Sequence, residues 1–181
     1  MKTSYLSVFR PFVIAVVAGL ALAACVAPGP KKPLPERVQV TWAPDDQLTE
    51  VKNNQSHRGW LRPEDWKKSL GDYLRQRANV VLPEGQTLDV KFNDIKLAGD
   101  FEPWRGPNAQ DIRFLTDLYP PRATLEYRLL DAHGKTIREG ESKLLDMSYL
   151  QRTVPTSTDP LRYDKRLLDD WINKEFGRKD V

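Results

Sequence analysis

ATLEYRLLDAHGKTIREGESKLLDM, residues 123–147, is the stretch that decides the fold. Its first part places apolar side chains at every second position, namely Ala123, Leu125, Tyr127 and Leu129. This period of two predicts a strand with one buried face. Residues 131–134 read as a hairpin turn, in which Gly134 can adopt a positive φ. Residues 136–147 are then predicted to return as the next strand, interrupted or bulged near Gly140.

Two further strands are predicted upstream of the hairpin. Residues 38–42 alternate apolar and polar side chains, and so do residues 88–92. After residue 92 the apolar positions switch from even to odd numbers, at Ile95 and Leu97. A strand keeps a strict period of two, so this switch requires an inserted residue or the end of the strand. The break is predicted at Asn93-Asp94.

Two helices are predicted, one before and one after the last three strands in the sequence. Pro63 opens the first, and its apolar stripe consists of Trp66, Leu70, Tyr73, Leu74 and Ala78. Asp159-Pro160 opens the second as N-cap and first helical residue, and Gly177 ends it. The stripe of the second helix consists of Leu161, Leu168, Trp171, Ile172 and Phe176. Polar loops are predicted over residues 43–59 and 148–158.

The order of these elements is strand, helix, three strands and helix. Strands linked by hairpins, with few helices, favour an antiparallel sheet that is covered on one face. The sequence therefore predicts a two-layer α+β domain over residues 37–181. About four antiparallel strands form its sheet, and two helices pack on one face.

The first 36 residues differ in character from this domain. A basic start and the short apolar run 12–22 precede Leu22-Ala23-Ala24-Cys25. This pattern predicts a secretory signal peptide over residues 1–24. Residues 25–36 are rich in proline and predict an extended tether, at about 3.1 Å per residue. Lys31 and Lys32 could contact anionic lipid headgroups or simply keep the tether soluble.

Leu-Ala-Ala-Cys resembles the bacterial lipobox. The resemblance implies that Cys25 becomes the new N-terminus and carries lipid, including an acyl chain such as palmitate, which anchors the protein to a membrane. Val26 follows this cysteine, where an aspartate would resemble a signal for retention in the inner membrane. The expected location is therefore the outer membrane, facing the periplasm.

Composition excludes several kinds of function. Cys25 is the single cysteine, so a lipidated protein has no thiol for a disulfide, a metal or a nucleophile. The 28 basic and 25 acidic side chains are nearly balanced, which gives no argument for nucleic acid as a partner. The chain has no motif for phosphate, dinucleotide or zinc binding, and we expect no cofactor, no metal and no catalytic residue. His57 and His133 fall in predicted loops.

A candidate functional patch follows the break in the second predicted strand. It consists of Asp94, Asp100, Glu102, Trp104, Asp111 and Arg113. The carboxylates could bind a hard cation or cap turns. Trp104 could form part of a binding lip or pack over the sheet edge. Arg113 could clamp an anionic ligand or pair with Asp111 or Asp94.

The same region resembles a known family. Residues 94–100, Asp-Ile-Lys-Leu-Ala-Gly-Asp, are similar to a signature of the family numbered 3016 among the domains of unknown function. Further similar elements are residues 111–113, the paired prolines 120–121, the strand and turn 125–134, and the helix segment 163–171, where Asp164 stands in place of an expected Glu. The resemblance covers residues 38–176. It implies an exported proteobacterial protein, and it carries no established activity.

Three functions follow as hypotheses. The first is a non-catalytic envelope module that is held to a membrane through Cys25 and binds a protein or cell-wall partner. The second is a hydrolase that cleaves glycan or cell-wall material with acids such as Asp94 and Asp100. The third is a sensor of a metal or small ligand built on residues 99–121. The oligomeric state is left open.

Overall fold

The computed structural model describes residues 37–54, 61–152 and 158–177. The predicted signal peptide, Cys25, the tether and His57 lie outside the described residues. The helices and strands are β1 (Val38–Trp42), η1 (Asp45–Gln47), α1 (Thr49–Asn54), α2 (Pro63–Val81), β2 (Thr87–Lys96), β3 (Asp100–Phe101), η2 (Pro103–Arg105), η3 (Pro107–Ala109), β4 (Arg113–Phe114), β5 (Arg122–Leu130), β6 (Thr136–Leu145) and α3 (Arg162–Phe176).

The main sheet has four strands in the order β1-β2-β5-β6, which confirms the predicted α+β class. The pairs β2–β5 and β5–β6 are antiparallel, as expected. The pair β1–β2 is parallel, so the sheet is mixed and not antiparallel throughout. The reason is that α2 connects β1 to β2, and a helical crossover returns the chain in the same direction.

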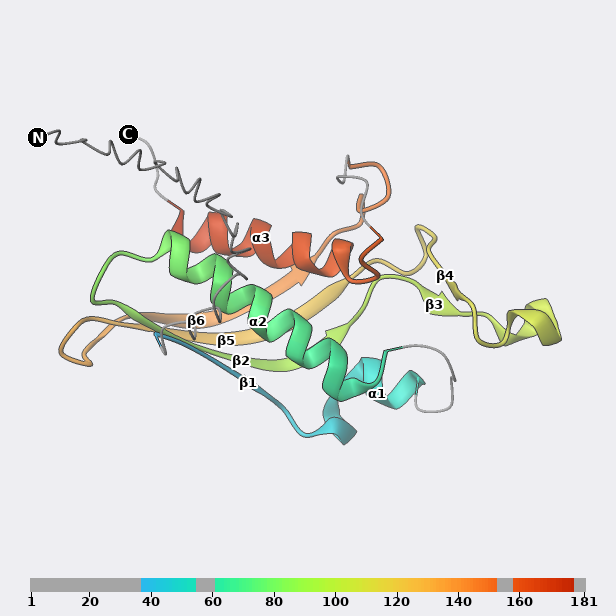
Figure 1. Ribbon diagram of the computed structural model, residues 1–181, viewed down its shortest axis with the longest axis horizontal. Helices are drawn as coiled ribbons and strands as arrows, with labels where there is room; N and C mark the ends of the chain where they lie inside the picture. Colours follow the sequence, from blue (N-terminus) through green and yellow to red (C-terminus); the bar gives the residue numbers. More distant parts are fainter. Residues whose placement is uncertain (1–36, 55–60, 153–157, 178–181) are drawn as a thin grey trace, which may run out of the picture. The chain divides into compact units, whose positions relative to one another are not determined.

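Helices α2 and α3 lie side by side over one face of this sheet (Figure 1). Most of the predicted apolar stripes is buried in the core that they share with the sheet, as Leu70 and Leu168 show. Tyr73 is half-buried, and its hydroxyl donates to Asp169 of α3 over 2.5 Å. The other face of the sheet carries polar side chains such as Thr41, Lys91 and Glu126. No described helix is long and apolar enough to span a bilayer.

The switch of apolar positions in β2 is a β-bulge. The register with β5 shifts between Phe92 and Asp94, and β2 continues through Lys96. Strand β6 was predicted to be interrupted or bulged near Gly140. It runs through Gly140 without interruption, and its register shift lies at Ile137, opposite Leu129 and Leu130. Gly140 instead accommodates the ring of Tyr127, since a Cβ at residue 140 would lie 3.4 Å from that ring.

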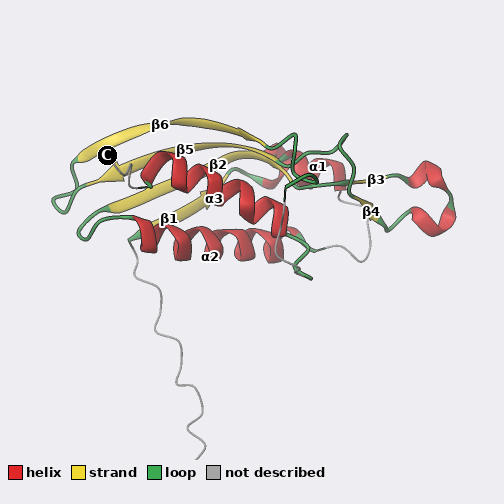
Figure 2. Cartoon of the chain, turned by 90° about the horizontal axis from the view of Figure 1, so that it is seen from above, coloured by secondary structure: helices red, strands yellow, loops and turns green. Residues whose placement is uncertain are grey.

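Two segments predicted as irregular contain secondary structure. The predicted loop 43–59 includes η1 and the short helix α1, whose Val51 joins the core with Leu48. The connection between β2 and β5 forms the two-stranded sheet β3–β4 and the turns η2 and η3. Residues 99–119, called the arm below, extend beyond the end of the main sheet (Figure 2).

Candidate functional site

Asp94 lies in β2 just after the bulge and is engaged in a structural role. One of its carboxylate oxygens accepts the backbone N–H of Thr49 over 2.7 Å, and the other accepts the Thr49 hydroxyl over 2.9 Å. These bonds satisfy polar groups at the first turn of α1, which would otherwise lack partners. The bulge therefore turns Asp94 toward α1, and Asp94 places α1 at the end of the sheet.

A buried charge network begins one residue further along α1. The Glu50 carboxylate accepts bonds from both terminal nitrogens of Arg113, over 2.7 and 3.1 Å. It also accepts the backbone N–H of Leu97 over 2.9 Å and lies 3.4 Å from the ammonium of Lys96. The side chains of Glu50, Lys96 and Arg113 are only 1, 5 and 3% exposed. The Glu50 carboxylate is thus shared by two cations, and such close pairing is the condition under which buried ions are tolerated.

Arg113 fastens the arm to the end of β2. Its Nε donates to the carbonyl oxygen of Ala98 over 2.7 Å, and one terminal nitrogen donates to Leu97 O over 3.0 Å. The Lys96 ammonium donates to Gly99 O over 3.0 Å and pairs with Asp100 at 3.3 Å. Both cations thus bind carbonyl groups of one short segment, where β2 ends and the arm begins.

Asp164 adds the helix α3 to the same region. Its carboxylate accepts the backbone N–H of Ala98 over 2.9 Å, and the residue is buried. Burial raises the pKa of Asp164 to about 7, against the lowering effects of the Ala98 bond and the Arg113 charge. The network therefore joins α1, β2, the arm and α3 through carboxylates that accept hydrogen bonds and through cations and backbone N–H groups that donate them.

Glu102 joins the two sides of the arm in a second, smaller cluster. It is buried, it accepts the Tyr119 hydroxyl over 2.9 Å, and it pairs with the guanidinium of Arg105. The bond to Glu102 raises the pKa of the Tyr119 hydroxyl. The Tyr119 carbonyl in turn accepts the backbone N–H of Gly99 over 2.9 Å. The first and last residues of the arm are thus tied to each other across its base.

The arm exposes apolar side chains at three separate positions along its sequence. Trp104 is 72% exposed, Ile112 51% and Leu118 78%. Asp111, predicted as part of the patch, is also exposed. The structure thus separates the six predicted residues, because Asp94, Asp100, Glu102 and Arg113 hold the base of the arm, while Trp104 and Asp111 face solvent. Arg113 pairs with the carboxylate of Glu50, a partner that the sequence analysis did not name.

Three network residues, Glu50, Lys96 and Asp164, were missed by the predictions from sequence. Asp164 had a detectable signal, because it stands at helical spacing between Leu161 and Leu168 on the buried stripe of α3. A buried acid on such a stripe needs a partner. Glu50 had no such signal, since its segment is short and polar.

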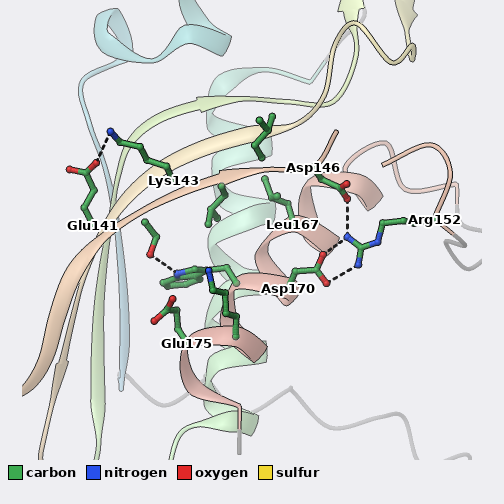
Figure 3. A pocket seen from close by; sticks show the side chains of 12 residues that line it. Glu141, Lys143, Asp146, Arg152, Leu167, Asp170 and Glu175 are labelled. Atoms are coloured by element: carbon green, nitrogen blue, oxygen red, sulfur yellow. Dashed lines mark hydrogen bonds and ion pairs between the residues drawn. The ribbon is translucent and has the colours of Figure 1, made fainter. Parts of the chain in front are cut away.

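Other polar groups in the described residues have ordinary structural roles or line a groove. His133 lies in the turn between β5 and β6, where Asp131 accepts its backbone N–H over 2.8 Å. A groove of about 390 Å³ lies between β6 and α3, and Arg152 bridges Asp146 and Asp170 beside it (Figure 3). The described part of the chain contains no cluster of three or more His, Cys, Asp or Glu suited to a metal ion.

The chain is similar to known proteins at two levels. Among solved structures, it is similar to the PelC dodecamer from Paraburkholderia phytofirmans and to a single-residue variant of that dodecamer, each with 10% identity and a TM-score of 0.37. These matches cover 81% of this chain and 93 to 94% of the other. No curated protein matches the chain. The family described as "Protein of unknown function (DUF3016)" matches residues 36–174, and the chain therefore belongs to this family.

Proposed function

We propose that this protein is a non-catalytic interaction module of the bacterial envelope, anchored by lipid on Cys25. Its signal peptide comprises residues 1–24, and residues 25–36 form the tether that lets the domain reach its partner. Support for the anchor comes from the lipobox-like sequence. The proposed location is the outer membrane, facing the periplasm, because Val26 follows the cysteine.

The arm is the surface proposed to bind the partner, which we take to be an envelope protein with a complementary apolar patch. The observation that carries this proposal is the exposure of Trp104, Ile112 and Leu118 on one projecting segment. Large exposed apolar side chains on a projecting segment are a common feature of interaction surfaces. Tryptophan is also among the residues that contribute most to binding energy when a partner covers them.

The rigidity of the arm's base supports the same proposal. Binding costs less free energy when the contact residues are already held in place. The network of Glu50, Lys96 and Arg113 fixes the arm on the domain, and Glu102 ties the beginning of the arm to Tyr119 at its end. The carboxylates thereby accept hydrogen bonds that hold the fold together. Asp94 and Asp100 are engaged in this way, and this role does not favour the hypothesis that they catalyse hydrolysis.

Site-specific photo-cross-linking in the native bacterium tests the proposal. A photoreactive amino acid replaces Leu118, and the adduct is followed in envelope fractions. We expect one discrete adduct that is lost in the additional variant Trp104→Ala. The control Val80→Ala removes an equally exposed apolar side chain from α2, and it should leave the adduct intact. No adduct, or an adduct indifferent to Trp104, would contradict the role of the arm.

A further inference from the structure

The strand β6 ends the main sheet on the side away from β1. In the part of the chain that the structure describes, no strand continues the sheet beyond it. This ten-residue edge leaves backbone N–H and C=O groups that can pair with another strand. Exposed apolar side chains also concentrate here, because Ile137, Leu145, Met147 and Leu150 lie on β6 or just after it. The edge of β6 lies outside the arm, while Tyr149, just after the strand, donates to Thr116 O of the arm over 2.9 Å.

The chemistry of this edge suits a second copy of the same strand. Two identical strands that pair antiparallel are related by a two-fold axis, and residues directly opposite each other point to the same face of the sheet. On β6 the side chains of Glu139, Glu141 and Lys143 point to the open face, because their neighbours Gly140 and Ser142 pair with the inward-facing Tyr127 and Leu125. The axis must therefore pass through a residue, and only a few registers are possible.

Charge selects one of these registers. An axis at Gly140 sets Glu139 against Glu141. An axis at Glu141 sets Glu139 opposite Lys143 but also sets Glu141 against its own copy, and an axis at Lys143 sets Lys143 against its own copy. An axis at Ser142 instead sets Glu141 of each strand opposite Lys143 of the other. Opposite charges across a strand pair stabilise it, and like charges directly opposite destabilise it. Edge lysines commonly prevent unwanted pairing, and in this register the lysine is neutralised.

The observed side chains can accept this arrangement. Within one strand, the Lys143 ammonium lies 3.5 Å from the Glu141 carboxylate, and the two side chains are 80 and 49% exposed (Figure 3). Each therefore has room for a second partner of opposite charge. On the inner face the centre is occupied by Ser142, a small side chain whose hydroxyl accepts the Trp171 indole N–H over 3.1 Å.

We propose that β6 pairs antiparallel with β6 of a second copy, centred on Ser142, and joins the two four-stranded sheets into one continuous sheet. Two Glu141–Lys143 pairs across the interface would form a closed ring of four alternating charges. The proposal is independent of the partner that the arm binds.

Sedimentation of the full-length protein in detergent tests this pairing through charge reversal. The variants Lys143→Glu and Glu141→Lys each turn two attractions into two repulsions, so each should weaken the dimer about tenfold or more. The double variant Glu141→Lys/Lys143→Glu restores alternation around the ring, and we expect it to dimerise like the wild type. Lys91→Glu makes the same charge change on the same face but in β2, and it serves as the matched control.

The outcomes separate a second copy from other occupants of the edge. A concentration-dependent dimer that is weakened by each single reversal and restored by the double variant supports the proposal. A wild type that stays monomeric, as it would if β6 bound only a different protein, overturns it. A dimer that ignores the reversals, or that the double variant fails to restore, places the interface elsewhere and also overturns it.

Discussion

Glu50 is the residue on which the base of the arm depends. Its carboxylate accepts bonds from Arg113 and from the backbone of Leu97, and it lies close to the Lys96 ammonium. All three charged side chains are buried, so each relies on the others in place of water. A buried ion group contributes little net stability when complete, but the loss of one member leaves the others uncompensated.

We therefore expect Glu50→Ala to lower the free energy of unfolding by about 3–5 kcal/mol, because Arg113 and Lys96 lose their shared carboxylate. Urea denaturation measures this change. The control is Asp72→Ala on the surface of α2, which removes the exposed partner of Lys68 and Arg75. Its effect should stay within about 1 kcal/mol. Equal effects of the two variants would show that the network is not buried as described.

Asp164 makes stability depend on pH. Its folded pKa of about 7 lies above the ordinary value of 3.8. As pH rises between these two values, the unfolded carboxyl loses its proton while the folded carboxyl keeps it. Deprotonation therefore favours the unfolded state, and the free energy of unfolding falls with rising pH and levels off above the folded pKa.

Asp164→Asn should remove this contribution, because the amide cannot ionise but its oxygen can still accept the Ala98 N–H. Between about pH 4 and 7, we expect the wild type to lose up to about 1.4 kcal/mol per pH unit relative to the variant. Chemical denaturation at a series of pH values measures the difference. Parallel pH profiles for the two proteins would mean that Asp164 is already ionised in the folded state.

Among the elements, the start of the arm requires a glycine at residue 99. Its φ is +80°, and a Cβ at this position would lie 2.6 Å from the Phe114 carbonyl oxygen. Gly134 has a nearly equal φ of +78°, but a Cβ there would meet nothing within 4 Å. The two glycines thus share the same backbone conformation, but only at Gly99 would a Cβ collide with a neighbouring segment.

This pair yields a matched prediction. Both Gly99→Ala and Gly134→Ala place a Cβ in the left-handed region, at a cost of about 1–2 kcal/mol. Gly99→Ala should cost about 1–3 kcal/mol more, because the methyl group collides with the second strand of the arm. Thermal or urea unfolding of the two variants gives the difference. If the two variants are equally stable, the close contact between Gly99 and Phe114 does not exist.

Some of the helices and strands can be predicted from the sequence, and others cannot. The alternation in β5 and the change of apolar positions in β2 are local patterns. They correctly predict a strand and a break at Asn93-Asp94, and the structure shows that this break is a bulge and not the end of the strand. Helix α1 is only six residues long and depends on Asp94, which is 45 residues away. The parallel pairing of β1 likewise depends on a partner beyond α2. Both were missed because their causes are contacts between distant segments.

The candidate site follows the same rule. A local cluster of polar residues drew attention to the segment from Asp94 to Arg113, and four of the six predicted residues lie at the base of the arm. Its central partner Glu50 lies 63 residues before Arg113, which no local pattern can reveal. The sequence also could not separate buried members of the cluster from exposed ones, because Glu102 and Trp104 are neighbours with opposite surroundings.

For the whole molecule, the proposed division of labour has three parts. Lipid on Cys25 would hold the protein at the membrane, the proline-rich tether would give it reach, and the folded domain would present two binding surfaces. One is the arm, which the charge network holds on the domain, and the other is the free edge of β6. A membrane-bound protein that pairs through this edge would present two arms and gain avidity for its partner.

We propose that the buried network positions the arm for binding, and the yield of the photo-cross-link from residue 118 measures this role. Glu50→Gln keeps the size of the side chain and removes the charge that holds Arg113. With equal amounts of protein, we predict a several-fold lower yield of the adduct than in the wild type. The exposed variant Asp72→Asn should give the wild-type yield. An adduct that forms equally well in Glu50→Gln would contradict the claim.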